Sequence, residues 1–285
     1  MDSTKIKIID SHAHLNFEAF NKDRDKVIED SHKKGVGMIN VGSAFDTSRK
    51  AVEIAQDYSR GIWAAIGVHP IHVLDEDFSQ EAMRDLACNN ERVVAIGETG
   101  LDYFHLNSKK GRLKTVAKAG QVEKIKDKQK KVLLSHLKLA RTLDLPLIFH
   151  CRCDKNMDAH YDMLEVLEEF SVEHNDFFLK GVMHCYTGNE EFAKIYLKLG
   201  LYLGWTGIIT FSSDYDEIIR QVPLERILIE TDCPYLSPEI RRGERNVPAN
   251  VWHVAGKIAQ VKGERLGRVI KQTRENARNL FGLDV

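Results

Sequence analysis

Short apolar segments rich in β-branched residues alternate along the chain with longer segments whose apolar side chains follow a helical period. The short segments predict buried parallel strands, and the longer ones predict helices that cover the sheet. Such an alternation is typical of repeated βα units. The eight predicted strands are residues 7–10, 38–41, 63–67, 93–97, 147–149, 181–183, 202–204 and 227–229.

The helical spacing i, i+3, i+4, i+7 is plainest over residues 51–58 and 192–199. Asp46 and Asn189 precede these two stretches, and their side-chain oxygens are expected to cap the helices. A closing helix is expected over residues 266–281. These helices would lie on the outside of the sheet.

Eight βα units favour an α/β fold of the (β/α)₈ TIM-barrel type. An open doubly wound sheet shows the same alternation and stays an alternative at this stage. The 285 residues fit one barrel of roughly 250 residues with extensions. We therefore predict a single domain over residues 1–285, with a basic insertion at about 104–128.

Composition narrows the class of protein. Hydrophobic residues make up 43% and charged residues 29%, which excludes a disordered, collagen-like or coiled-coil chain. The chain has no apolar run of about 18 residues and no signal-peptide pattern, and its five cysteines are an odd number. We expect a soluble intracellular protein with free thiols, no membrane association and no obligate protein partner. Cytoplasm is the default location, and nuclear entry stays open.

The net charge of −1 gives no overall basic footprint, but its distribution is uneven. Residues 109–131 hold ten lysines and arginines against two acidic residues. A solvated helical face or a mobile loop explains such a run. The alternative is a surface that attracts the backbone of a polyanion such as DNA.

A His-x-His pair ends the first predicted strand. His12 and His14 are two residues apart, and side chains at i and i+2 of an extended chain point to the same side, so both imidazoles can reach one cation. Alone, the pair is also compatible with a structural role.

Other side chains that commonly bind metals follow the later predicted strands. In a barrel the carboxyl ends of the strands converge on one face, so these side chains would meet in a small volume. One cation rarely needs so many ligands, whereas two cations sharing a carboxylate would use them all. The candidate metal ligands are His12, His14, Glu98, His150, His184 and Asp232.

Two further histidines and the cysteines are interpreted differently. His136 lies on the apolar stripe of a predicted helix and is expected to be structural. His69 follows the third strand and could either line the mouth of the barrel and contact substrate or shape a loop. The cysteines beside the candidate ligands, such as Cys151, are not expected to bind metal.

The segments around these residues resemble, in order along almost the whole chain, the motifs of TatD-related metal-dependent deoxyribonucleases. The matching segments are Asp10-Ser11-His12-Ala13-His14-Leu15, Gly67-Val68-His69-Pro70, Gly97-Glu98-Thr99-Gly100-Leu101-Asp102-Tyr103, His150-Cys151-Arg152, His184-Cys185-Tyr186-Thr187-Gly188, Glu230-Thr231-Asp232-Cys233-Pro234-Tyr235-Leu236 and Arg242-Gly243-Glu244-Arg245-Asn246-Val247-Pro248.

The resemblance implies a barrel of the metallo-dependent hydrolase type that hydrolyses phosphodiester bonds of DNA, as a 3′–5′ exonuclease, with two divalent cations (Mg²⁺, Mn²⁺ or Zn²⁺). The six candidate ligands fall on the family's metal-binding positions, and Glu98 would be the bridging carboxylate. Glu98 and Asp232 are the expected catalytic residues, since Asp232 could also orient or deprotonate the attacking water.

Substrate contacts are expected from His69, Arg152, Tyr103 and Tyr186, and Trp205 is a further candidate for stacking. Arg152 could hold a phosphate bidentately, and His69 could line the site. Tyr103 and Tyr186, together with Trp205, lie near strand ends and could stack on unpaired bases, although packing in the core is the simpler interpretation of each.

Two other functions stay open. The same fold and metals would serve a hydrolase of a small ester, lactone, amide or aminoacyl-nucleic acid, because neither selects the substrate. A non-catalytic barrel with a structural metal site is disfavoured, because six intact candidate ligands are more than a binding protein needs.

Overall fold

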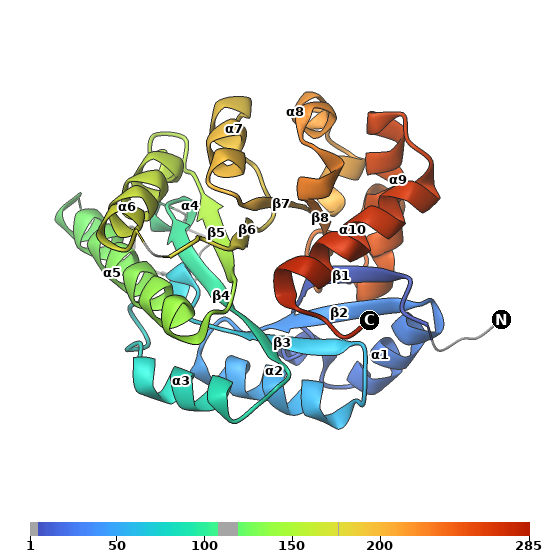
Figure 1. Cartoon of the computed structure of the whole chain (residues 1–285), viewed down its shortest axis with the longest axis horizontal. Coiled ribbons are helices and arrows are strands. Elements are labelled where there is room, and N and C mark those ends of the chain that lie inside the picture. The colour runs from blue at the N-terminus through green and yellow to red at the C-terminus, as the bar shows by residue number, and fades with distance from the viewer. Residues whose placement is uncertain (1–4, 108–118, 176) are drawn as a thin grey trace.

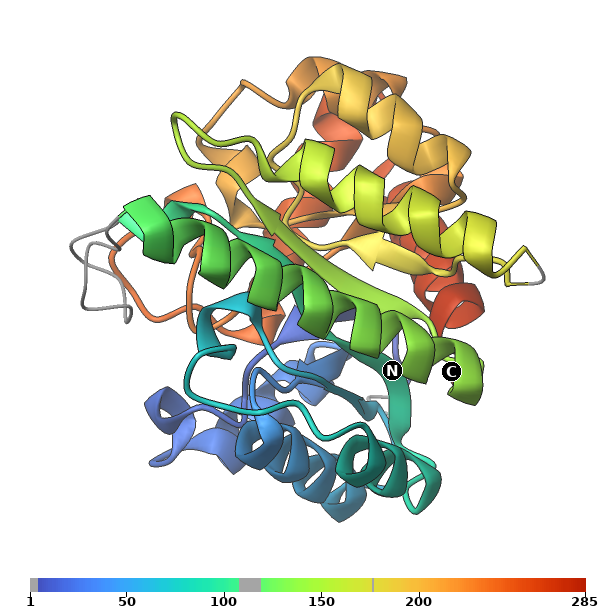
Figure 2. The ribbon, with the colours of Figure 1, turned by 90° about the vertical axis from the view of Figure 1, so that its left-hand side faces the viewer.

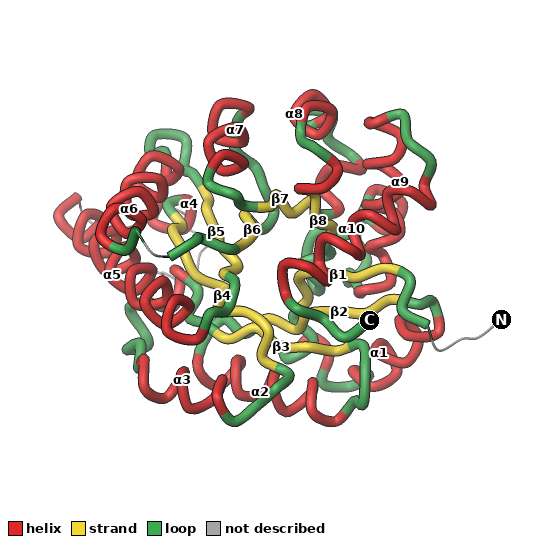
Figure 3. Tube along the Cα trace, viewed as in Figure 1, coloured by secondary structure: helices red, strands yellow, loops and turns green. Residues whose placement is uncertain are grey.

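The computed structural model describes residues 5–107, 119–175 and 177–285, and its eight strands form one parallel sheet in the order β1-β2-β3-β4-β5-β6-β7-β8. The sheet curves until its two edges meet, where the backbone N–H of Asp232 donates to the carbonyl of His12 at 2.8 Å and that of His14 donates to Cys233 at 2.9 Å. Helices surround the ring of strands (Figure 1, Figure 3). The predicted (β/α)₈ barrel is confirmed, and the open sheet is excluded.

Each predicted strand overlaps an observed one. The strands are β1 (Ile8–Ala13), β2 (Val36–Val41), β3 (Ile62–Ile66), β4 (Val93–Asp102), β5 (Leu147–Arg152), β6 (Gly181–Met183), β7 (Tyr202–Trp205) and β8 (Ile227–Ile229). Strands β1, β4 and β5 run three to five residues beyond their predicted ends, so several candidate ligands lie within strands rather than after them.

The α-helices in the described residues are α1 (Arg24–Lys33), α2 (Phe45–Asp57), α3 (Gln80–Cys88), α4 (Phe104–Asn107), α5 (Ala119–Leu143), α6 (Ala159–Glu173), α7 (Glu190–Lys198), α8 (Asp216–Gln221), α9 (Val251–Lys262) and α10 (Leu266–Phe281). Six 3₁₀ turns occur in the same residues: η1 (Glu18–Phe20), η2 (Pro70–His72), η3 (Gly207–Thr210), η4 (Leu224–Arg226), η5 (Glu239–Arg241) and η6 (Pro248–Asn250). Helices α5 and α6 lie next to each other over β4 and β5 (Figure 2).

The caps show how local chemistry sets helix starts. Asn189 caps α7 as predicted, since its side chain accepts from the backbone N–H of Phe192 at 2.9 Å. The prediction for Asp46 is wrong, because α2 begins at Phe45 and Asp46 lies in its first turn. The hydroxyl of Thr47 instead accepts from the backbone N–H of Ala44 at 2.8 Å. The closing helix spans its predicted residues.

Two apolar clusters fill the molecule. One consists of strand residues such as Ile39, Ile148 and Leu228 together with the end of α10, where Phe281 closes the barrel at the amino ends of the strands. The larger one joins the strands to the surrounding helices. The apolar filling leaves the carboxyl ends of the strands as the place for polar side chains.

Pairing is irregular at two points on that face. The β1–β2 register shifts between Asp10 and Ala13, and the β4–β5 register shifts between Gly97 and Thr99. Such irregularities re-aim side chains next to functional sites. They flank two of the candidate ligands, His12 and Glu98.

The predicted basic insertion is only partly described. Residues 104–107 form α4 and residues 119–128 begin the long helix α5, whereas the five basic residues between 109 and 118 lie outside the described residues. On α5, Lys130 pairs with Asp162 at 2.7 Å and Lys128 pairs with Asp77 at 3.3 Å. This half of the basic run is therefore a helix packed on the barrel, with part of its charge paired.

His136 is structural, as predicted. It lies buried on α5, where its Nδ1–H donates to the carbonyl of Val132 at 2.7 Å and its Nε2 accepts from the backbone N–H of Val68 at 3.0 Å. The second bond requires the neutral ring, because Nε2 accepts only when it carries no proton. Elsewhere, a search of the described helices finds none with the length and apolar character of a membrane span.

Candidate active site and metal centre

The carboxyl ends of the strands bring all six candidate ligands together. His12 and His14 turn their Nε2 atoms toward each other at 3.1 Å. The Oδ1 atom of Asp232 lies 3.8 Å from the first and 3.3 Å from the second. Three donor atoms that converge in this way form one group able to hold a cation.

A second group lies on the other side of Glu98. The Oε1 atom of Glu98 is 2.9 Å from Nδ1 of His150 and 3.8 Å from Nε2 of His184. Its Oε2 atom faces the first group, at 3.4 Å from Nε2 of His12. Glu98 therefore presents one oxygen to each group, which is the geometry of a carboxylate that can bridge two cations.

Neighbouring acceptors determine which ring nitrogen of three histidines faces the donor groups. The Nδ1–H of His14 donates to the carbonyl of Val41 at 2.8 Å. The Nε2–H of His150 donates to Asp102 at 3.0 Å, and Nδ1 of His184 lies 2.8 Å from Glu230. A metal-binding histidine needs such a partner on its other nitrogen to fix its tautomer. The residues present thus fit divalent cations.

Two buried carboxylates support this arrangement. Asp10 accepts from the backbone N–H of Thr231 at 2.8 Å and from that of His12 at 3.2 Å, which joins β1 to the segment after β8. Glu230 accepts from the backbone N–H of Cys185 at 2.6 Å. Burial raises the pKa of Asp10 well above its ordinary value, although its bonds from Thr231 and His12 oppose this.

The site concentrates negative charge. Burial opposes ionisation of Glu98, yet His69 and His12 hold its pKa well below the ordinary value. Burial opposes ionisation of Asp102 and Asp232 in the same way, but neighbouring histidines lower both pKa values. Three ionised carboxylates in a buried space favour a cation there.

The histidines respond to the same charges. Burial lowers the pKa of His12 to about 4, and the nearby His184 adds to the effect. Burial also opposes protonation of His150 and His184, but bonds to Asp102 and Glu98 raise the pKa of His150 to about 9. The charge of Glu230 raises the pKa of His184 to about 10. Protonated histidines thus compensate the carboxylates in the metal-free protein.

His69 lies within this site. Its Nε2 is 3.4 Å from Oε1 of Glu98 and 3.2 Å from Nδ1 of His150. Its Nδ1 accepts from the backbone N–H of Ile71 at 3.1 Å, so the proton is on Nε2. The ring can therefore donate a hydrogen bond into the site.

Arg152 and the predicted stacking residues lie in different surroundings. Arg152 is exposed at the end of β5, with its guanidinium 4.0 Å from the ring of Phe104. Tyr103 and Tyr186 are buried, and their hydroxyls donate to Asp162 and to the carbonyl of Asn189, each at 2.5 Å. Trp205 is buried as well. Packing in the core explains these three rings, and none offers an open face to a base in this conformation.

All five cysteines are free, as expected. Cys151 is buried with its Sγ 3.3 Å from Nδ1 of His160, away from the candidate ligand groups. The sequence interpretation did not assign three supporting carboxylates, Asp10, Asp102 and Glu230. All three stand inside the quoted motifs, where a carboxylate near a candidate ligand was the available signal.

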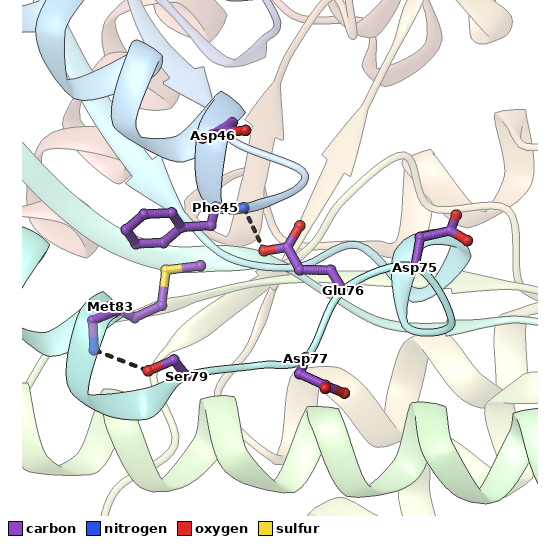
Figure 4. A pocket seen from close by; sticks show the side chains of 8 residues that line it. Phe45, Asp46, Asp75, Glu76, Asp77, Ser79 and Met83 are labelled. Carbon is purple, nitrogen blue, oxygen red and sulfur yellow. Dashed lines mark hydrogen bonds between the residues drawn. The ribbon is translucent and has the colours of Figure 1, made fainter.

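A separate hollow of about 390 Å³ lies between the start of α2 and the segment before α3 (Figure 4). Its acidic lining, with Asp46, Asp75, Glu76 and Asp77, would repel a phosphate. Oε1 of Glu76 accepts from the backbone N–H of Phe45 at 2.6 Å, so this acid serves the start of a helix. The active-site chemistry is elsewhere.

The sequence profile described as TatD related DNase matches residues 9–282, which include every candidate ligand. The chain belongs to this family. It is a TatD-family metal-dependent hydrolase with clusters of histidine and carboxylate groups that could hold metal ions.

Curated relatives cover nearly the whole chain. The uncharacterized metal-dependent hydrolase YabD of Bacillus subtilis (strain 168) is 36% identical over 280 residues, 97% of this chain and 100% of that protein. The 3′-5′ ssDNA/RNA exonuclease TatD of Escherichia coli (strain K12) is 31% identical over 285 residues, 97% of this chain and 99% of that protein.

Solved structures of TatD relatives have the same fold. The TatD homologue YJJV of Escherichia coli K12 superposes with a TM-score of 0.81 at 26% identity, covering 98% of this chain and 99% of that one. The phosphotriesterase homology protein of Escherichia coli superposes with a TM-score of 0.62 at 15% identity, covering 99% and 100%, which supports the barrel alone.

Proposed function

We propose that this chain hydrolyses phosphodiester bonds of DNA as a 3′–5′ exonuclease, with two divalent cations. The observation that carries the proposal is the position of Glu98, whose two oxygens face two separate groups of donors. Phosphodiester hydrolysis suits such a pair, because charge develops on the attacking and leaving oxygens together. Relatives named 3′-5′ ssDNA/RNA exonuclease, at 31% identity, support the same substrate class.

The first cation would be held by His12, His14 and Asp232, and the second by His150 and His184, with Glu98 shared. Bound there, the cations would polarise the phosphoryl oxygens and acidify a water molecule. Mg²⁺, Mn²⁺ and Zn²⁺ are all candidates, since the donor set mixes imidazole with carboxylate.

The remaining steps fall to the chain's own residues. The side chain of Asp232 is 15% exposed and ionised, so its carboxylate can orient the attacking water and accept its proton. His69 donates from Nε2 toward a phosphoryl oxygen. Arg152 holds the neighbouring phosphate, for which its planar guanidinium suits two parallel hydrogen bonds.

The alternative is hydrolysis of a small ester, lactone, amide or aminoacyl-nucleic acid at the same site. The assay that separates the two uses end-labelled single- and double-stranded DNA and single-stranded RNA, with Mg²⁺, Mn²⁺ or Zn²⁺ added or with EDTA. We expect metal-dependent stepwise shortening of single-stranded DNA from its 3′ end, lost in EDTA. Protein that contains metal and cleaves no nucleic acid, but turns over an ester or amide panel, would replace this proposal by the alternative.

A further inference from the structure

Exposed aromatic side chains gather on the face that carries the candidate metal centre. Within the described residues, five phenylalanine, tyrosine or tryptophan side chains are exposed, and four of them follow the carboxyl end of a strand. These four are Phe104 after β4, Tyr161 after β5, Phe211 after β7 and Tyr235 after β8. The fifth, Phe178, precedes β6 at the opposite end of the barrel.

Tyr235 is joined directly to the first group of candidate ligands. Its backbone N–H donates to the carbonyl of Asp232 at 2.9 Å. The ring of Tyr235 meets that of Phe17 edge-on, with 6.4 Å between the ring centroids. Phe17 in turn stacks on His14, with 4.3 Å between their centroids. A continuous series of rings therefore leads from a candidate ligand to Tyr235, which is 56% exposed.

Phe104 is joined to the second group. It lies two residues after Asp102, which bonds His150, and its ring lies beneath Arg152, which is two residues after His150 on β5. The Cζ atom of Arg152 lies 4.0 Å from the centroid of the Phe104 ring. The side chain of Phe104 remains 39% exposed. An arginine beside an open ring combines a phosphate contact with a stacking surface.

The two rings stand on opposite sides of the barrel. Phe104 belongs to the β4–β5 side and Tyr235 to the β8–β1 side, four strands apart in a ring of eight. The strands in question face each other across the ring in Figure 3. Glu98 and the two donor groups lie between these sides, so a phosphate at the centre would have an aromatic ring toward each end of its chain.

We propose that Phe104 and Tyr235 stack on the two bases that flank the scissile phosphate of an unpaired nucleic-acid strand. The inference rests on the proposed function and names two side chains that bind the unpaired strand. Stacking on an aromatic ring accepts any base, so it gives affinity without sequence preference. In a duplex the base faces are covered by neighbouring bases, so unpaired strands are bound in preference to duplexes.

The test measures binding separately from cleavage. A fluorescently labelled oligothymidine is titrated in EDTA with the wild type, with Phe104→Leu and with Tyr235→Leu, while cleavage is followed separately with Mn²⁺. We expect each variant to bind about 10-fold more weakly, as the loss of one base stack implies. Phe104→Trp, which keeps an aromatic ring, should bind as tightly as the wild type. Phe178→Leu, at the far end of the barrel, should also bind like the wild type.

A second substrate removes the bases instead of the rings. When tetrahydrofuran spacers replace the bases that flank the cleaved bond, the wild type loses about 10-fold in affinity and the two variants lose little more. Wild-type affinity in both variants, or an equal loss on normal and spacer-containing strands, would overturn the stacking proposal while leaving hydrolysis intact. A wild type that binds through the rings but cleaves nothing would overturn only the proposed hydrolysis, and one that neither binds nor cleaves would overturn both.

Discussion

The carboxylate of Asp102 lies 3.0 Å from Nε2 of His150 and 2.8 Å from Nδ1 of His105. It is buried, and it turns the other nitrogen of His150 toward Glu98. One residue therefore determines which nitrogen of the ring is available to the second donor group.

Replacing Asp102 by Asn weakens this control, because the amide carries no charge and can face His150 with its NH₂ group. We expect the affinity for the second cation to fall by about 10–100-fold while the first changes little. Competition with a chromophoric chelator measures both affinities. Asp162→Asn, which affects the pairs with Tyr103 and Lys130 instead, serves as the control. Equal affinities in Asp102→Asn and the wild type would contradict this role.

Gly204 makes room for Glu230. A Cβ atom at this position would lie 2.6 Å from the carboxylate, which pairs with His184 and accepts from the backbone of Cys185. Gly204→Ala should therefore lower the free energy of unfolding by roughly 1–3 kcal/mol. It should also weaken binding of the second cation. Thermal unfolding and metal titration measure the two effects.

Gly256 on α9 is the matched control for Gly204, because a Cβ there would meet nothing within 4 Å. Gly256→Ala should stabilise the protein by up to about 1 kcal/mol through helix propensity alone. Equal effects of the two substitutions would contradict the steric account.

His136 predicts a pH dependence of stability. Burial lowers its pKa from 6.5 to about 4, although its bond to Val132 opposes this. Above pH 6.5 the ring is neutral in both states. Between pH 6.5 and about 4 only the unfolded chain takes up the proton, so the free energy of unfolding falls by up to about 1.4 kcal/mol per pH unit from this group.

Urea unfolding of the wild type and His136→Gln from pH 8 to pH 5 tests this dependence. The variant should be less stable at pH 8, because Val68 and Val132 lose their partner. The free energy of unfolding of the variant should then fall less steeply than that of the wild type below pH 6.5. Above pH 6.5 the difference between the two free energies should be constant. Parallel declines below pH 6.5 would show that His136 does not set the dependence.

The barrel could be predicted from the sequence because each strand has an apolar segment of its own. The strand ends could not, since β4 continues from Gly97 to Asp102 through polar residues whose backbone still pairs with β5. The shifts of register beside His12 and Glu98 arise from pairing between distant segments, and no local pattern reveals them.

The candidate ligands could be proposed because a histidine or acid at a strand end is visible in the sequence. Exposure of a ring is not visible there. Tyr103 and Phe104 are adjacent, yet Tyr103 points into the core toward Asp162 on α6, whereas Phe104 remains partly exposed under Arg152. Packing of α5 and α6 against the barrel decides between them, and this packing is a property of the whole fold.

The most direct test of the central claim concerns Glu98, which links the two donor groups. Cleavage of 5′-labelled single-stranded DNA and bound metal are measured together for the wild type, for Glu98→Gln and for Glu76→Gln, a partly buried acid in the separate hollow. The account predicts that Glu98→Gln folds normally, retains less metal and loses cleavage by on the order of 10³-fold, while Glu76→Gln behaves like the wild type. Unchanged cleavage or unchanged metal content in Glu98→Gln would contradict it.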